Sequence, residues 1–236
     1  MKYKYNLAVD IHDVDANGEA RASALMRYMQ TAAQSQLTEN GMSYDALKQR
    51  RRAFILSKIT MEFTESLRAY APLSAISYPV ESRGYTFFRC YALERDGEIV
   101  GRAVSAWALI DTDTHALVKV NDFELGITTE ERDEMALERF SLPATLSEAG
   151  FYRVRYSDLD QNGHMNNTRY PDMYANFLPM EGKRISRITI SWMAEAPTGE
   201  NLRVMLGEAN GIYYFRTLRE DGRVNTEAQV MLTEIS

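Results

Sequence analysis

The sequence predicts an α+β protein in which two similar halves each wrap an antiparallel sheet around one long helix. Three observations lead to this prediction: a polar frame that occurs twice, a helix with an apolar stripe after each copy, and a run of four strand-like segments after each helix. An amphipathic helix cannot bury its stripe alone, so the sheet of each half must cover it. Two such halves in one chain favour side-by-side packing as an internal pseudo-dimer.

The repeated frame is D-x-D-x-N-G, which begins at Asp13 in the first half and at Asp158 in the second. Each copy follows a strand-like segment and precedes a helix. The next residue is Glu19 in the first copy and His164 in the second. We interpret the pair as a duplicated fold in which one site has degenerated.

The first half opens with an alternating segment, residues 2–9, which predicts a strand. The helix after the frame is expected to end at Asn40 and Gly41, a common C-terminal stop. Its apolar positions recur at helical spacing, at Ala22, Leu25, Met26, Met29, Ala32, Ala33 and Leu37. After a short helical patch, strands are predicted at residues 53–65, 74–82, 84–95 and 99–110.

The second half repeats this order. Alternation of Tyr152, Val154 and Tyr156 predicts a half-buried strand. A helix should then begin near Asn166 or Asn167, with Pro171 in its first turn, where the missing N–H costs nothing. Strands are predicted at residues 184–194, 201–208, 211–219 and 223–234.

The acidic segment TTEERDEMALERF, with Pro143 after it, predicts a partly helical connector between the halves. We therefore place an N-terminal domain at residues 1–122, a linker at 123–148 and a C-terminal domain at 149–236.

The composition excludes several classes of protein. A net charge of −6 argues against a general nucleic-acid binder. The single cysteine, Cys90, rules out an intrachain disulfide and a cysteine-based zinc site. The first residues hold no apolar stretch of signal-peptide length, and no run approaches the roughly 20 apolar residues of a membrane span. We expect a cytoplasmic protein with no membrane span.

The loop from Asp158 to His164 admits three interpretations. As a calcium loop it lacks the bidentate glutamate at the twelfth position, which is Arg169 here and Ala24 in the first copy. As a turn, the Asp, Asn and Gly residues need no further role, and this is the favoured interpretation of the first copy.

The third interpretation is hydrolysis. Asp160, Asn162 and His164 are spaced by two, so in an extended loop their side chains could face one side. Histidine takes a proton from water readily at neutral pH. The chain has no G-x-S-x-G elbow, so attack by an activated water is favoured over a serine acyl-enzyme.

The run S-D-L-D-x-N-x-H-x-N-N-x-x-Y, from Ser157 to Tyr170, closely resembles the signature of acyl-acyl-carrier-protein (acyl-ACP) thioesterases. The segment AVSAWALIDTDTHALVKV, with Trp107 and Asp111, resembles the end of that family's first domain. The resemblance implies two tandem hotdog domains, each a long helix wrapped by an antiparallel β-sheet.

By the same resemblance, the catalytic residues are Asp160, Asn162, His164 and Glu195. Glu195 alone would be interpreted as a solvated strand-end residue. His164 and Glu195 would activate or orient water, Asp160 would orient His164, and Asn162 would position the carbonyl or the water. Which of His164 and Glu195 is the base stays open, and no metal or other cofactor is expected.

The chain departs from the family at one position. Many plant members carry a cysteine directly after this glutamate, whereas this sequence has Ala196. A cysteine nucleophile at that position is therefore not required. The N-terminus lacks the transit peptide of plant members, which indicates a bacterial type.

The expected function is hydrolysis of fatty acyl-ACP to free fatty acid and ACP, within fatty acid biosynthesis. The acyl carrier protein and its fatty acyl chain are the expected partners, and a second copy of the chain is an additional candidate. Alternatives are an acyl-CoA thioesterase of the same fold and a non-catalytic acyl-binding protein.

The resemblance also places an acyl tunnel in the first domain, beside the helix bearing Met26 and Met29. Such methionines are more often plain core than tunnel lining. The acidic carrier should dock on basic residues, with a merely solvated face as the alternative. The candidates are Arg50, Arg51, Arg52, Lys183, Arg184 and Arg187.

Overall fold

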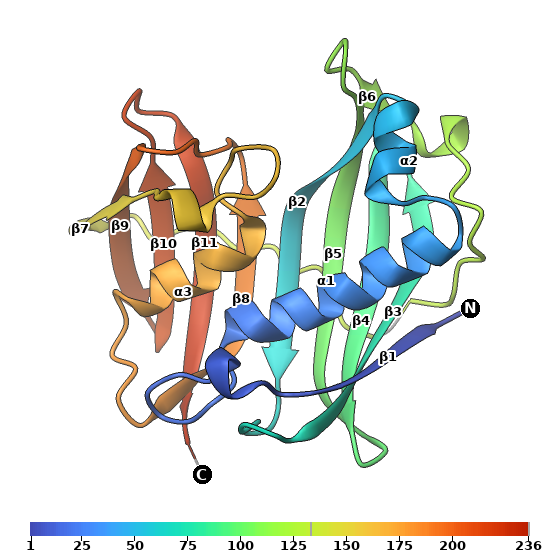
Figure 1. The fold of residues 1–236 in the computed structure, drawn as a ribbon. Coiled ribbons are helices and arrows are strands. Elements are labelled where there is room, and N and C mark those ends of the chain that lie inside the picture. Colours follow the sequence, from blue (N-terminus) through green and yellow to red (C-terminus); the bar gives the residue numbers. More distant parts are fainter. Residues whose placement is uncertain (133, 236) are drawn as a thin grey trace.

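A computed structural model describes residues 1–132 and 134–235. Residues 133 and 236, which belong to the predicted linker and second domain, lie outside the described residues. In the described part the strands form a single sheet, and the long helix crosses one face of it (Figure 1).

The sheet is built from two runs of strands with matching order. The helices are α1 (Ala22–Glu39), α2 (Tyr44–Gln49) and α3 (Tyr170–Ala175), with 3₁₀ turns at Ile11–Asp13, Val120–Asp122, Tyr156–Asp158 and Asn167–Arg169. The strands of the first half are β1 (Tyr3–Ala8), β2 (Arg52–Phe63), β3 (Pro72–Arg83), β4 (Thr86–Arg95), β5 (Glu98–Asp111) and β6 (Leu117–Val118). Those of the second half are β7 (Ser147–Arg153), β8 (Lys183–Trp192), β9 (Asn201–Ala209), β10 (Ile212–Leu218) and β11 (Val224–Glu234).

The order across the sheet is β1-β3-β4-β5-β2-β8-β11-β10-β9-β7, with β6 beside β5. The two halves therefore mirror each other about the β2–β8 pair. These strands run antiparallel, with Ile59 opposite Ile190 and Met61 opposite Ile188. The predicted α+β arrangement of two halves packed side by side is confirmed.

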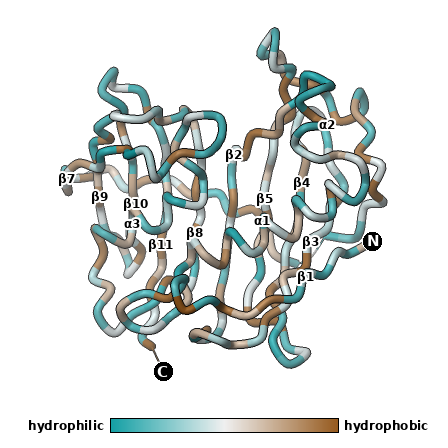
Figure 2. The backbone as a smooth tube through the Cα atoms, viewed as in Figure 1, coloured by the Kyte–Doolittle hydropathy of each residue, from teal (hydrophilic) through white to brown (hydrophobic). Residues whose placement is uncertain are grey.

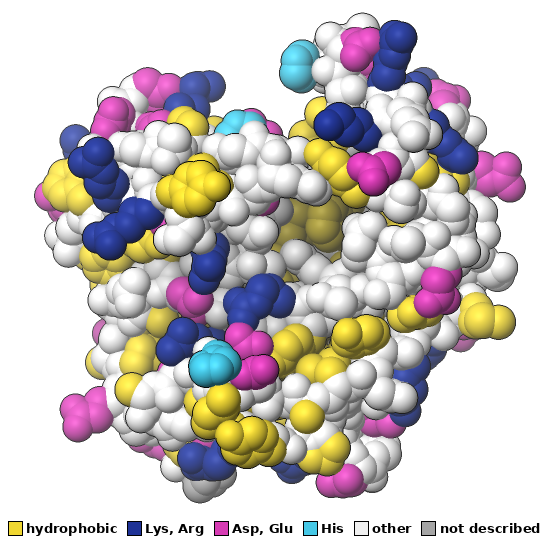
Figure 3. Space-filling view, viewed as in Figure 1, with side chains coloured by type: hydrophobic (Ala, Val, Ile, Leu, Met, Phe, Trp, Pro, Cys, Tyr) yellow, Lys and Arg dark blue, Asp and Glu magenta, His cyan; other side chains and the backbone are white. Residues whose placement is uncertain are grey.

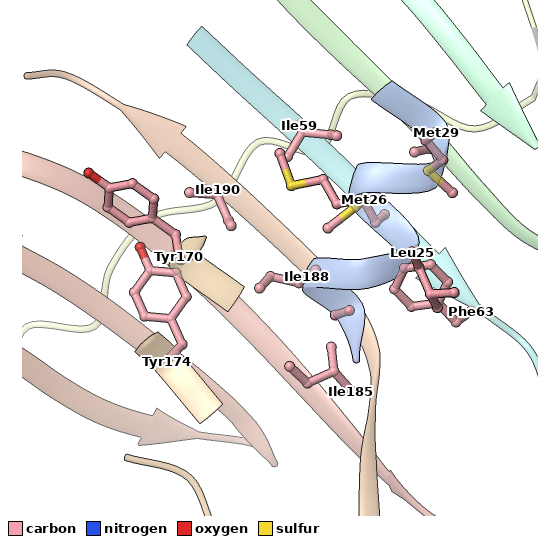
Figure 4. Close-up of a cluster of buried hydrophobic side chains, with 14 of the residues drawn as sticks. Leu25, Met26, Met29, Ile59, Phe63, Tyr170, Tyr174, Ile185, Ile188 and Ile190 are labelled. Atoms are coloured by element: carbon pink, nitrogen blue, oxygen red, sulfur yellow. The ribbon is translucent and has the colours of Figure 1, made fainter. Parts of the chain in front are cut away.

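The core lies between α1 and the two central strands. Met26 of α1 points toward Ile59 of β2 and toward Ile188 and Ile190 of β8, and Leu25 lies beside Phe63 of β2 (Figure 4). Met26 and Met29 are both fully buried. One helix thus covers the seam between the halves, and hydrophilic residues gather in the connecting loops (Figure 2).

The second helix is short, so the expectation of a long helix in each half holds only for the first. α3 has six residues, against 18 in α1. After Ala175 the chain continues in tighter turns, in which the Phe177 N–H donates to Tyr174 at 3.0 Å and the Leu178 N–H to Ala175 at 3.2 Å. Pro179 then keeps Leu178 from continuing the helix. The predicted start is confirmed: Asn166 caps the 3₁₀ turn by accepting the Thr168 N–H at 2.9 Å, and Pro171 lies in the first turn of α3.

The strand before the loop is also shorter than expected. β7 ends at Arg153, and Tyr156, predicted as a buried strand position, is 89% exposed. The chain turns away from the sheet there, because the Asp158 side chain accepts the Arg155 N–H at 2.9 Å and starts a 3₁₀ turn.

The described part of the linker contains no α-helix, so the helical expectation for TTEERDEMALERF is wrong. Glu130 donates its N–H to Pro79 and Glu138 donates its N–H to Thr60, which ties the segment to the sheet. Met135 and Leu137 pack on the small apolar cluster around Val104 on the outer side of the sheet. Burial of this face outweighs the local helix propensity. The domain limits proposed from sequence stay a prediction.

The first copy of the polar frame joins the two halves. The Asn17 amide donates to the carbonyls of Met180 (2.7 Å) and Lys183 (3.1 Å), and its oxygen accepts the Gly182 N–H at 3.3 Å. The loop of the first half thus holds the α3–β8 connection of the second. Within residues 1–132 and 134–235, no helix is both long and apolar enough to cross a membrane.

Replacement of Asn17 by alanine should destabilise the protein by roughly 1–3 kcal/mol, because two backbone carbonyls lose their donor. Urea unfolding measures this change. Asn6→Ala, which removes only an exposed contact with Ser74, serves as the matched control. Equal stability of the two variants would contradict a structural role for the first frame.

Candidate active site

The second copy of the frame folds into a turn held by Asp160. Its carboxylate accepts the N–H of Asn162 at 2.8 Å and that of His164 at 3.4 Å, while its own N–H donates to the His164 carbonyl at 2.8 Å. Gly163 has φ of 80°, which glycine adopts without steric cost. Asp160 therefore fixes the backbone that carries His164.

The first copy makes the same turn. Asp15 accepts the N–H of Asn17 at 2.8 Å and that of Glu19 at 3.0 Å, and Gly18 has φ of 78°. The shared frame thus fixes the same backbone turn in both halves. What differs is the side chain at its end. Glu19 is 2% exposed and is bound by Ser66 and Arg68.

Glu195 meets His164 across the second loop. The distance from His164 Nε2 to Glu195 Oε2 is 3.2 Å. The backbone brings the two together, because His164 pairs with Pro197 in a β-bridge and the Met165 N–H donates to the Ala196 carbonyl at 2.8 Å. Glu195 therefore lies beside the histidine, as the resemblance implied. The side chain of His164 is 34% exposed and that of Glu195 is 60% exposed, so water reaches both groups.

The Glu195 segment is held by a buried residue that the sequence analysis did not single out. Asn225 on β11 is fully buried and donates to the Ala194 carbonyl and to the Tyr170 hydroxyl, the latter at 3.1 Å. Its oxygen accepts the Thr217 hydroxyl at 2.9 Å. Burial raises the pKa of Tyr170 well above its usual range, so this hydroxyl stays a neutral hydrogen-bond partner. An asparagine inside a strand is disfavoured by propensity, and that was the available signal.

Asn162 points toward the first half. Its amide oxygen accepts the Tyr44 hydroxyl of α2 at 3.1 Å, and its nitrogen lies 3.4 Å from Asp160 Oδ2. The loop of the second half therefore contacts the short helix α2 of the first half. The loop of the first half makes the reciprocal contact, through Asn17, with the α3–β8 connection of the second half.

A cavity of about 480 Å³ opens beside this contact. Its walls are α1, α2 and strands β2, β4 and β5 of the first half, with Asp160, Asn162 and Thr168 from the second. Figure 3 shows a hollow with a hydrophobic floor near the middle of this face. The cavity has the size of an ordinary small-ligand site.

Met26 and Met29 do not line this cavity. The α1 positions that line it are Arg27, Gln30, Thr31, Ala33, Gln34 and Leu37. Both methionines are fully buried members of the main hydrophobic cluster, so they belong to the core.

The carboxylates of the loop are already engaged. Asp158 and Asp160 accept backbone N–H groups, and Arg169 donates to the Ser157 carbonyl at 3.1 Å. Among the described residues, no group of three His, Cys, Asp or Glu side chains is placed to hold a metal ion. The arrangement instead offers an imidazole and a carboxylate in contact, with His164 on the same loop as Asp160 and Asn162, which line the cavity. Such a pair is suited to acid–base chemistry on a bound substrate.

Two family models match the chain. The acyl-ACP thioesterase N-terminal domain matches residues 1–125, and the acyl-ACP thioesterase C-terminal domain matches residues 143–233. The chain belongs to the acyl-ACP thioesterase family. The resemblance seen in the loop is thereby confirmed.

Relatives within this family are distant. An oleoyl-acyl carrier protein thioesterase from Arabidopsis thaliana is 24% identical over 204 residues, covering 77% of this chain and 56% of the relative. A dodecanoyl-[acyl-carrier-protein] hydrolase from Cinnamomum camphora is 24% identical over 231 residues, covering 89% of this chain and 60% of the relative. The chain thus spans less than two thirds of the length of these relatives.

Solved structures of acyl-ACP thioesterases share the fold over nearly the whole chain. The Bacteroides thetaiotaomicron enzyme superposes with a TM-score of 0.89 at 21% identity, covering 98% of both chains. The 12:0-ACP thioesterase of Umbellularia californica gives 0.84 at 17% identity, covering 99% of this chain and 97% of the other. The tandem hotdog class expected from the sequence is confirmed.

Substitution of Asn225 by alanine should destabilise this thioesterase-family protein by roughly 1–3 kcal/mol, because the buried Tyr170 and Thr217 hydroxyls and the Ala194 carbonyl lose a hydrogen-bond partner. We expect it also to slow hydrolysis of acyl-ACP, the activity proposed below, because the Glu195 segment loses its anchor. Thermal unfolding and steady-state kinetics measure the two effects. Asn201→Ala, which removes a contact with the exposed Glu220, is the control. Unchanged kinetics in Asn225→Ala would show that this contact does not position Glu195.

Proposed function

We propose that this protein hydrolyses the thioester between a fatty acyl chain and the phosphopantetheine arm of acyl carrier protein, releasing free fatty acid. The contact of 3.2 Å between His164 Nε2 and Glu195 Oε2 carries the proposal. Membership of the acyl-ACP thioesterase family supports the substrate class.

In the proposed reaction, water attacks the thioester carbonyl, and the thiolate leaves with a proton. Glu195 and His164 together take the proton from water, and the histidine returns one to the sulfur. Because both side chains are partly exposed and in contact, a water can approach either of them. Asp160 keeps the loop in shape through its backbone contacts, and Asn162 faces the cavity, where its amide can hold the carbonyl or the water.

The cavity of the first half is the proposed site for the acyl chain. It extends from the Asn162–Tyr44 contact along α1 and the inner face of the sheet. The thioester would lie at the loop of the second half, and the chain would enter the first half. This division explains why both halves are needed for one site.

Carrier docking is proposed near α2. Arg50, Arg51 and Arg52 follow α2, and Arg52 lines the cavity. Arg184 instead binds the carbonyls of Phe63 and Thr64, at the opposite end of β2. That end is roughly 36 Å away along a strand of 12 residues.

Replacement of His164 by alanine should lower kcat/KM for acyl-ACP by roughly 100-fold or more, because general acid–base catalysis is lost. Glu195→Gln should cause a loss of the same order. Release of free thiol from acyl-ACP measures both. His12→Ala is the control, because His12 is exposed and lies in the first half, distant in the sequence from His164. Wild-type turnover in His164→Ala would overturn the mechanism, and faster hydrolysis of acyl-CoA than of acyl-ACP would identify the other carrier.

Docking on basic residues predicts that KM for acyl-ACP rises with salt while KM for a small acyl thioester does not. Arg50→Glu should raise KM for acyl-ACP several-fold. Lys183→Glu carries the same charge change at the other end of the sheet and should have little effect. Equal effects of the two reversals would contradict docking at α2.

A further inference from the structure

The cavity contains a buried arginine. Arg89 lies on the inner face of β4, is 7% exposed and lines the cavity together with Phe87 and Tyr91 of the same strand. β4 is two strands beyond β2, so Arg89 lies about 10 Å across the sheet from the strand that adjoins the second half.

The partners of Arg89 are neutral. One guanidinium nitrogen, Nη1, donates to Gln36 Oε1 at 2.6 Å and to Ser77 Oγ at 2.8 Å. Among the described residues, no carboxylate forms an ion pair with it. Burial lowers the pKa of the guanidinium, yet arginine keeps its charge in proteins. A buried cation without an anion is costly, so an uncharged residue would be the ordinary choice for a hydrocarbon pocket.

Other polar groups lie on the same walls. Tyr91 and Trp107 line the cavity, and Ser105 joins them: the Trp107 Nε1–H donates to Ser105 Oγ at 2.7 Å, and Ser105 Oγ donates to the Tyr91 hydroxyl at 3.3 Å. Across from the sheet, Gln30 of α1 lines the cavity, and its Nε2 is shielded from solvent and has no hydrogen-bond partner among the described residues. Donors on both walls favour a ligand with an acceptor oxygen.

We propose that the cavity selects acyl chains whose tail carries an oxygen-bearing group, a carboxylate or a hydroxyl, and that Arg89 binds this group. The proposal rests on the function proposed above and names its substrate class. An unsubstituted tail would cover the free Nη2 and Nε donors of Arg89 without satisfying them. A tail oxygen would accept hydrogen bonds from these donors in place of the water that the acyl chain displaces.

A structural role is the rival explanation. Arg89 holds Gln36, whose Nε2 donates to the Met1 carbonyl at 2.9 Å, so the arginine could serve only to fix the N-terminal strand to α1. Loss of that role would lower activity on every chain alike. Selectivity between chains separates the two explanations.

The experiment compares kcat/KM for acyl-ACP substrates of equal length with an ω-carboxyl, an ω-hydroxyl or an unsubstituted end. The wild type should prefer at least one oxygen-bearing chain by about 10-fold or more. In Arg89→Met the ratio of kcat/KM between the oxygen-bearing and the unsubstituted chains should fall to about one. Arg89→Lys keeps the charge and should retain part of the preference. Arg216→Met, which removes a cation paired with Glu227 on the second half, should leave the preference intact.

Preference of the wild type for the unsubstituted chain, or an unchanged ratio in Arg89→Met, would overturn the proposal. Absence of hydrolysis for every chain would instead refute the proposed function. In that case calorimetry of the three free acids with wild type and Arg89→Met decides the present proposal: tighter binding of an oxygen-bearing acid that depends on Arg89 supports it, and equal binding overturns it.

Discussion

The pairing of β2 with β8 is the constraint on which the rest of the structure depends. It joins two five-stranded runs into one sheet, with Thr60 and Thr189 fully buried at its centre and their hydroxyls 3.1 Å apart. Each half also presents its polar loop to the other, with Asn17 bound to the α3–β8 connection and Asn162 bound to Tyr44 of α2. On the inner face of the seam, Met26 of α1 packs near Ile59, Ile188 and Ile190 (Figure 4).

The duplicated loop has the same backbone turn in both halves, but it has a different role in each. An aspartate accepts two N–H groups and a glycine completes the turn in each copy. In the first copy the last residue, Glu19, is buried and paired, so the loop serves as a joint between the halves. In the second, His164 stays partly exposed beside Glu195. The chemistry of the site therefore comes from the residue at the end of the loop and from Glu195 beside it, since the turn itself is common to both copies.

The candidate site is composite. Its reactive groups come from the second half, and its cavity comes chiefly from α1, α2 and the sheet of the first. Asn225 and Tyr170 hold the segment that carries Glu195, through contacts within the core of the second half. On the cavity side, Arg89 and the Tyr91–Ser105–Trp107 chain give the inner wall a polarity that a hydrocarbon pocket does not require.

The sequence by itself determined the repeat, the strands after each helix, the capped start at Asn166 and the loop that carries His164, because each is written in residues close together in the chain. Glu195 was indicated only by family resemblance. Tertiary structure decided its contact with His164, the role of Asn225, the extended linker and which side of α1 lines the cavity. These features depend on strand register and on the rotation of α1 about its axis. Both bring together residues that are distant in the chain, so no local sequence pattern indicates them.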